Sequence, residues 1–152
     1  MTAHKQRKTM ANFPPTVTEL LDEFQDMQDW DERYDYIIDL GRELPPLDPA
    51  LQTEDNLVQG CMSTVWLVTQ IDSKPPHNIH IQADSDSIIV KGLIVILLSH
   101  YDGKAAKDIL TADAIEMFGK LGLNQHLSPQ RRNGLFSMVK RLKQLAADHT
   151  LD

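Results

Sequence analysis

Residues 57–71 read LVQGCMSTVWLVTQI, and this stretch decides the fold class of the chain. β-Branched and large apolar residues alternate here with other side chains, a pattern that favours strands. The pattern predicts two strands, with a break at Gly60 and Cys61. A proline-rich turn follows at 72–78, and residues 79–83 predict another strand. We therefore expect a small antiparallel sheet of three strands.

Two helical patterns precede this region. Apolar residues at helical spacing predict a helix over 16–27, with Thr16 and Glu19 as a capping box. A second pattern runs from Asp29 to Leu44, where a pair of prolines ends it. The sheet is therefore expected to follow a pair of helices.

Residues 84–100 are ambiguous, because their isoleucines and valines favour a strand by propensity. The length of the run favours a buried helix instead, with Asp84, Ser85 and Asp86 as capping residues. The lack of a polar face on this helix indicates a central position in the core.

The last third of the chain predicts further helices. Short ones are expected at 105–110 and 113–121. A longer one begins after Ser128, which caps it, with Pro129 at its first position. The whole pattern indicates an α+β fold with helices packed against a three-stranded antiparallel sheet. We expect one domain over 16–149, preceded by a flexible tail at 1–15.

Composition limits the possible functions of this chain. It has 152 residues, 41% of them hydrophobic, and a formal net charge of −7, which argues against binding to nucleic acid. The apolar run at 88–98 is far shorter than the roughly 20 residues that cross a bilayer, so no membrane association is expected. A single cysteine fits a reducing compartment. We expect a cytoplasmic protein.

Acidic residues gather in the first half of the chain and basic residues near its end. Solvated helix faces of opposite charge are the simpler interpretation, and a surface that steers a partner is the alternative. Asp84 and Asp86 have the spacing of oxygen ligands for a divalent metal, but helix capping is the favoured interpretation. The histidines match no metal-site spacing. We expect neither a metal nor a cofactor of the chain's own.

Cys61 is the candidate for chemistry. A lone cysteine is often a buried apolar residue, but Cys61 follows a glycine and stands among the polar residues Gln59 and Ser63. A reactive thiol on a turn is therefore the competing interpretation. A thiol hydrolase using Cys61, His126 and Asn133 is a further alternative, although the sequence around Cys61 lacks the papain-type pattern.

Several strings in this sequence, taken together and in this order, resemble the SufE family of sulfur acceptors. They are Glu54 to Cys61 (EDNLVQGC), Val65 to Leu67 (VWL), Ala83 to Asp86 (ADSD), Ile89 to Ile94 (IVKGLI), Tyr101 to Lys104 (YDGK), Leu121 to Leu123 (LGL) and His126 to Leu135 (HLSPQRRNGL). The resemblance covers about residues 20–142. Met62 departs from it, because the family often has glutamine at that position.

The resemblance implies a fold shared with IscU-type scaffold proteins and a cysteine desulfurase as partner, which carries the pyridoxal phosphate. It implies that Cys61 takes a persulfide sulfur from the desulfurase, stimulates that enzyme and passes sulfur to iron–sulfur cluster assembly on scaffold proteins. The chain would then be a carrier rather than an enzyme, and a monomer or weak dimer.

The resemblance also suggests supporting residues around Cys61. Asp86 and Arg131 match family positions linked to packing and signalling around the acceptor loop, and the matching strings also contain Gln59, Gly60, Asp84 and His126. We further expect the resting thiol to lie in an apolar pocket, with the segment from Asp84 to Asp86 and the start of the next helix bracing its turn.

Overall fold

The computed structural model describes residues 13–150. The tail expected at 1–15 therefore lies outside the described residues, except for 13–15. In chain order the elements are α1 (Val17–Gln25), α2 (Trp30–Glu43), the short 3₁₀ helices η2 (Pro49–Leu51) and η3 (Glu54–Asn56), β1 (Val65–Ile71), β2 (Asn78–Ser85), α3 (Ile88–Tyr101), β3 (Lys104–Ala105), α4 (Ala106–Thr111), α5 (Ala114–Lys120), α6 (Leu123–His126) and α7 (Pro129–Thr150).

The first two helices begin where the sequence predicts. Thr16 accepts a hydrogen bond from the backbone N–H of Glu19 (3.1 Å), while the Glu19 carboxylate accepts one from the Thr16 N–H (2.9 Å). This confirms the capping box of α1. Asp29 caps α2 through the N–H of Glu32 (2.9 Å), and the helix ends at Glu43.

The sheet has three antiparallel strands, but the third is not the one that the sequence predicts. β1 pairs with β2 from Val65 opposite Ser85 to Ile71 opposite Ile79. Between residues 13 and 60 no strand forms: Leu57 makes only a single bridge to Trp66. The third strand is β3, which pairs with the start of β2. The predicted strand fails because the chain leaves the sheet here, and Gly60 and Cys61 contact α7 instead.

The central helix is confirmed, but its predicted start was wrong. β2 continues to Ser85, and α3 begins only at Ile88, with Ser87 as its N-cap. Asp84 is part of the β ladder, opposite Trp66, and so cannot cap a helix. Most of α3 is buried, which explains why its sequence has no polar face.

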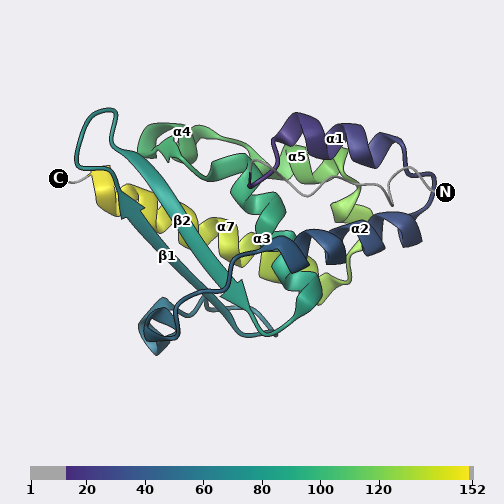
Figure 1. Cartoon of the computed structure of the whole chain (residues 1–152), viewed down its shortest axis with the longest axis horizontal. Coiled ribbons are helices and arrows are strands. Elements are labelled where there is room, and N and C mark those ends of the chain that lie inside the picture. The colour runs from purple at the N-terminus through teal and green to yellow at the C-terminus, as the bar shows by residue number, and fades with distance from the viewer. Residues whose placement is uncertain (1–12, 151–152) are drawn as a thin grey trace.

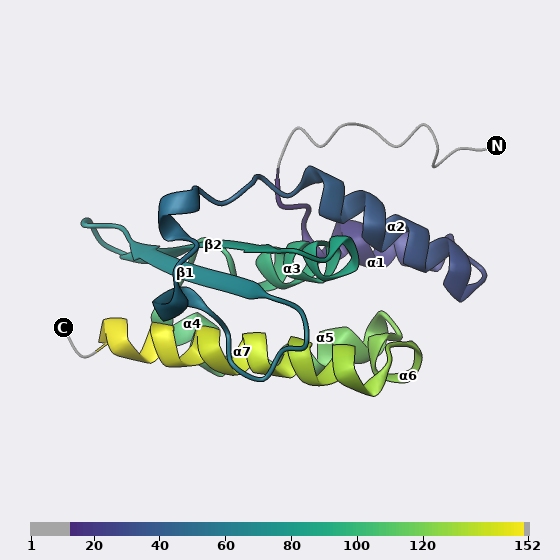
Figure 2. The ribbon, with the colours of Figure 1, turned by 90° about the horizontal axis from the view of Figure 1, so that it is seen from below.

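The helices form layers around β1, β2 and α3. Figure 2 shows α7 running beneath the sheet, with α4, α5 and α6 on the same side. Helices α1 and α2 lie on the other side of α3 (Figures 1 and 2). α5 and α7 confirm the helices predicted at 113–121 and after Ser128, and α4 confirms the one at 105–110. The short helix α6, whose last residue is His126, was not predicted.

Candidate functional site

Cys61 lies in a loop of residues 57–64, called here the Cys61 loop, which connects η3 to β1. The backbone N–H of Val58 donates to the carbonyl oxygen of Val65 (2.9 Å), and the Leu57–Trp66 bridge lies just outside this pair. These contacts close the base of the loop. Figure 2 shows the loop as a thin curve that descends across the side of α7.

Asp86 holds the second arm of the Cys61 loop. Its carboxylate accepts a hydrogen bond from the backbone N–H of Thr64 (3.1 Å), and its own N–H donates to the Thr64 carbonyl (3.3 Å). The Ser85 hydroxyl donates to the same carbonyl (2.7 Å). The carboxylate predicted to cap α3 is therefore bound to the loop that carries the cysteine.

Asp84 serves a different connection. It is 6% exposed, and its carboxylate accepts hydrogen bonds from the backbone N–H groups of Leu47 (3.0 Å) and Ser85 (2.8 Å), with the Lys91 ammonium at 3.7 Å. Asp84 thus ties the segment after α2 to the end of β2. Neither aspartate caps a helix. Within residues 13–150, no three His, Cys, Asp or Glu side chains are placed to hold a metal ion.

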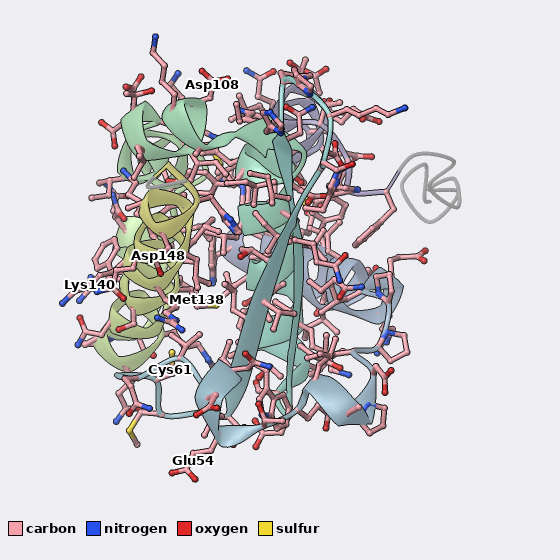
Figure 3. All side chains as sticks on the ribbon, turned by 90° about the vertical axis from the view of Figure 1, so that its left-hand side faces the viewer. Glu54, Cys61, Asp108, Met138, Lys140 and Asp148 are labelled. Carbon is pink, nitrogen blue, oxygen red and sulfur yellow. The ribbon has the colours of Figure 1, made fainter. Side chains whose placement is uncertain are left out.

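The Cys61 thiol points toward α7. Its S–H donates to the carbonyl oxygen of Gly134 at 3.5 Å, a long and weak hydrogen bond, and the side chain is half-buried beside the core. Figure 3 shows the sulfur next to the α7 ribbon, on the same side of the molecule as Met138. Burial raises the pKa of the Cys61 thiol above its ordinary value, because the thiolate is poorly solvated there. The neutral thiol is therefore favoured at rest.

A cavity of about 230 Å³ opens beside the thiol and is called here the Cys61 cavity. Apolar side chains from β1, α3 and α7 form much of its wall, together with the half-buried Arg131. Its lining residues are Cys61, Met62, Ser63, Val65, Val90, Leu93, Ser128, Gln130, Arg131, Gly134, Leu135 and Met138. The structure thus brings Arg131 to the same cavity as Cys61.

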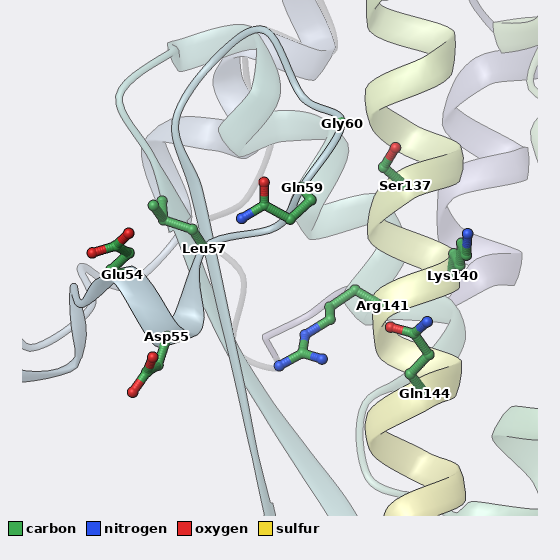
Figure 4. Close-up of a pocket in the computed structure, with 9 residues that line it drawn as sticks. All are labelled: Glu54, Asp55, Leu57, Gln59, Gly60, Ser137, Lys140, Arg141 and Gln144. Carbon is green, nitrogen blue, oxygen red and sulfur yellow. The ribbon is translucent and has the colours of Figure 1, made fainter.

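A second cavity, of about 580 Å³, lies on the other side of the loop and is called here the rear cavity. Figure 4 shows Glu54 and Asp55 on one wall and α7 on the other, with the Arg141 side chain reaching across between them. Gln59 and Gly60 belong to this cavity rather than to the Cys61 cavity. The Cys61 loop therefore lies between the Cys61 cavity and the rear cavity.

Gly60 has a φ of +91°, a backbone conformation that residues with a Cβ rarely adopt. A Cβ built at this position would lie 2.6 Å from the Ser137 hydroxyl oxygen of α7. The glycine thus allows both the sharp turn before Cys61 and the close approach of the loop to the helix. It also explains why no strand forms here.

The geometry gives no support to a thiol hydrolase. The His126 ring stacks on Trp30, with ring centroids 4.6 Å apart and planes inclined by 16°. Neither His126 nor Asn133 lines the Cys61 cavity, and Asn133 is exposed. Among the proposed supporting residues, Gln59 and Gly60 belong to the Cys61 loop, and Asp86 and Arg131 lie beside it. His126 packs instead at the start of α2.

The contribution of α7 to this site was not predicted from the sequence. Gly134 and Ser137 face the Cys61 loop one turn apart, and Met138 lines the Cys61 cavity. The pair Gly134-x-x-Ser137 was a readable signal, since two small residues on one helix face permit close approach by another segment. What approaches that face follows only from the tertiary structure.

Comparisons with known proteins agree with this architecture. Residues 18–146 match the family model SufE, described as an Fe-S metabolism associated domain. The chain is 45% identical over 135 residues to an uncharacterized SufE-like protein of Rhizobium etli, covering 88% of this chain and 91% of the relative. It is 43% identical over 130 residues to an uncharacterized SufE-like protein of Rhizobium meliloti, covering 84% and 92%.

A solved structure shares the fold. The solution structure of a hypothetical protein from Thermus thermophilus superimposes with a TM-score of 0.72 at 17% identity, covering 91% of this chain and 98% of that one. Within the part of the chain that the structure describes, no helix is long and apolar enough to cross a bilayer. The family match over most of the chain and the two similar relatives establish that this protein belongs to the SufE family.

Proposed function

We propose that this protein accepts a sulfur atom on Cys61 from the persulfide of a cysteine desulfurase, stimulates that enzyme, and passes the sulfur to iron–sulfur cluster assembly. Family membership supports a role in Fe-S metabolism. The observation that carries the finer proposal is the setting of Cys61: a lone thiol on a loop that is fastened at its base and lies between two cavities.

The proposed transfer needs no cofactor on this chain. The Cys61 thiolate attacks the outer sulfur of the desulfurase persulfide, so a new S–S bond forms on Cys61 while the S–S bond of the donor breaks. The desulfurase cysteine leaves as a thiolate and takes up the proton that Cys61 gave to solvent. Pyridoxal phosphate stays in the partner, which forms the original persulfide. This chain would act as a carrier.

The resting geometry supports a protected thiol. Because burial raises the pKa of Cys61, only a small thiolate fraction is present in the free protein at neutral pH, and stray electrophiles meet an unreactive group. Docking to the desulfurase would favour a conformation with the loop swung outward. If that form has a population of about 1% in the free protein, the partner must favour it by a few kcal/mol.

The supporting residues have separate parts in this proposal. The Asp86 carboxylate restrains the loop through Thr64, so it opposes opening. Arg131 places a cation beside the Cys61 cavity, where it would stabilise the negative charge of a thiolate or persulfide. We propose that the protein works in the cytoplasm as a monomer or weak dimer, a state that size-exclusion chromatography with light scattering would measure.

Desulfurase turnover tests this function. Sulfide or alanine release by a cysteine desulfurase should rise when the wild-type chain is added, and Cys61→Ser should give no rise. Circular dichroism should show that Cys61→Ser folds normally, since the only hydrogen bond that the thiol makes within residues 13–150 is long and weak. Full stimulation by Cys61→Ser would overturn the acceptor proposal.

A further inference from the structure

The Cys61 loop touches α7 at two neighbouring points. The thiol donates to the Gly134 carbonyl, and Gly60 lies against the Ser137 hydroxyl. Gly134 and Ser137 are three residues apart, and therefore share one face of the helix. The loop therefore packs on two small residues of α7, with Gly134 beneath Cys61 and Ser137 beneath Gly60.

We propose that Ser137 is a positioning residue for Cys61: through its contact with Gly60, the size of the side chain at 137 sets how deeply the thiol lies and how fast it reacts at rest. The inference rests on the proposed function only for its biological meaning. The contact itself, and its effect on thiol exposure, belong to the isolated chain.

Few other contacts hold this part of the loop. Asp86 and Ser85 restrain it at Thr64, and Val58 restrains its other arm. Between those points, the Cys61 thiol is the only loop side chain that hydrogen-bonds to another part of the described chain. With a cavity on each side, the loop has room to shift. How closely the loop approaches α7 is therefore set by the side chains of α7 directly beneath it.

The helix beneath the loop is the less movable partner. α7 is 22 residues long and is anchored in the core by Leu135, Met138, Leu142 and Ala146. A larger side chain at 137 would meet Gly60 at a point where the loop is exposed and the helix is packed. The loop is expected to yield, and Cys61 would be lifted with it because it is the next residue.

Alkylation of Cys61 by iodoacetamide, measured on the isolated chain by mass spectrometry, tests the proposal. Ser137→Leu should react about tenfold faster than wild type, as when a minor open state rises from about 1% to about 10%. The pH profile of the rate should also shift to lower pH, because a more exposed thiol ionises more readily. A folded Ser137→Leu with the wild-type rate and profile would overturn the proposal.

A double-mutant cycle isolates the contact even if Ser137→Leu does not fold. Gly60→Ala places a methyl group 2.6 Å from the Ser137 oxygen, whereas in a Ser137→Ala background the nearest remaining atom is the Cβ, at 3.5 Å. Gly60→Ala should therefore accelerate alkylation more in the wild-type background than in Ser137→Ala, by about threefold or more. Equal effects in both backgrounds would show that the contact does not set the depth of Cys61.

Asn133→Leu is the matched control, because it adds the same side chain to an exposed position of α7 that lines neither cavity. It should alkylate at the wild-type rate. A rate as fast as that of Ser137→Leu would overturn the proposal, since the effect would then belong to the helix in general. These assays contain no desulfurase, so their failure is distinct from a failure of sulfur transfer.

Discussion

Glycine permits a close approach at two places in this fold, and the two places differ in what the glycine approaches. Where α2 crosses α3, a Cβ at Gly92 would overlap the backbone carbonyl of Ile37, and one at Gly41 would lie 2.6 Å from the carbonyl oxygen of Ile88. At the functional site, a Cβ at Gly60 would meet the side-chain hydroxyl of Ser137. The first contact joins two buried helix backbones, and the second joins an exposed loop to a side chain.

Because of this difference, the first contact should matter for the stability of the fold and the second for the reactivity of Cys61. The α2–α3 crossing cannot relax, since the opposing atoms are backbone in a packed core, so an added methyl group must displace a helix. The Cys61 loop can move into the space on either side of it. We therefore expect substitutions at the crossing to change the free energy of unfolding, and substitutions at the loop to change the reaction rate of Cys61.

The largest expected effect is at the crossing. Gly92→Ala should lower the free energy of unfolding by about 3 kcal/mol, because overpacking outweighs the roughly 1 kcal/mol gain in helix propensity. Urea denaturation measures it. Gly119→Ala in α5 is the matched control, since its Cβ would lie 3.5 Å from the Asn124 amide nitrogen, an ordinary contact, and it should not destabilise. Equal stability of the two variants would show that the α2–α3 crossing tolerates an added methyl group.

The next effect is at the loop. Asp86→Arg removes the carboxylate that binds the Thr64 N–H, so Cys61 should alkylate several-fold faster and accept sulfur more readily, while the free energy of unfolding changes by only about 1 kcal/mol. Asp86→Asn keeps an acceptor oxygen and should stay close to wild type. An Asp86→Arg variant that alkylates at the wild-type rate would show that this aspartate does not restrain the loop.

The smallest expected effect is that of pH, which should change the stability of the fold and the reaction rate of Cys61 through different groups. Burial, followed by the positive charge of Lys104, lowers the pKa of His100 at the end of α3, with Asp113 opposing and Lys143 adding to the shift. The ring also packs edge-on against Tyr101. Because the unfolded chain then binds the proton more readily, stability should fall as the pH drops below the ordinary value of 6.5.

His100→Phe should weaken this pH dependence. Neither ring nitrogen of His100 has a hydrogen-bond partner within residues 13–150, so phenylalanine removes a titrating group without breaking a hydrogen bond. Thermal melts between pH 5 and 7, an interval chosen around the ordinary histidine pKa of about 6.5, measure the slope. The same acidification should slow Cys61 alkylation equally in both proteins. An unchanged slope in His100→Phe would assign the acid sensitivity to other groups.

Local sequence signals predicted much of the fold. The Thr16 box, the Asp29 cap and the paired prolines after α2 act within a few residues of themselves, so their effect is readable from sequence. The error at Asp84 and Asp86 has a different origin. Aspartate is a common helix N-cap, but these two carboxylates accept hydrogen bonds from the backbone N–H groups of Leu47 and Thr64, which are distant in the chain.

The candidate site was predictable only in part. Cys61 and Gly60 were identified because a glycine before a lone cysteine is a local pattern, and the family strings reinforced it. Gly134 and Ser137 lie more than 70 residues away in the chain, and only the fold brings them beneath the loop. The third strand was misplaced for a similar reason, since β3 has only two residues and too little sequence to carry a pattern.

The most direct test of sulfur acceptance is the mass of the protein after reaction. The wild-type chain should be incubated with a cysteine desulfurase and cysteine, separated without reductant, and analysed intact and after proteolysis. We expect a gain of one sulfur atom on the peptide containing Cys61, reversed by a thiol reductant and absent from Cys61→Ser. A wild-type chain that gains no sulfur while the desulfurase turns over, or one that gains it on a residue other than Cys61, would show that Cys61 is not the sulfur acceptor.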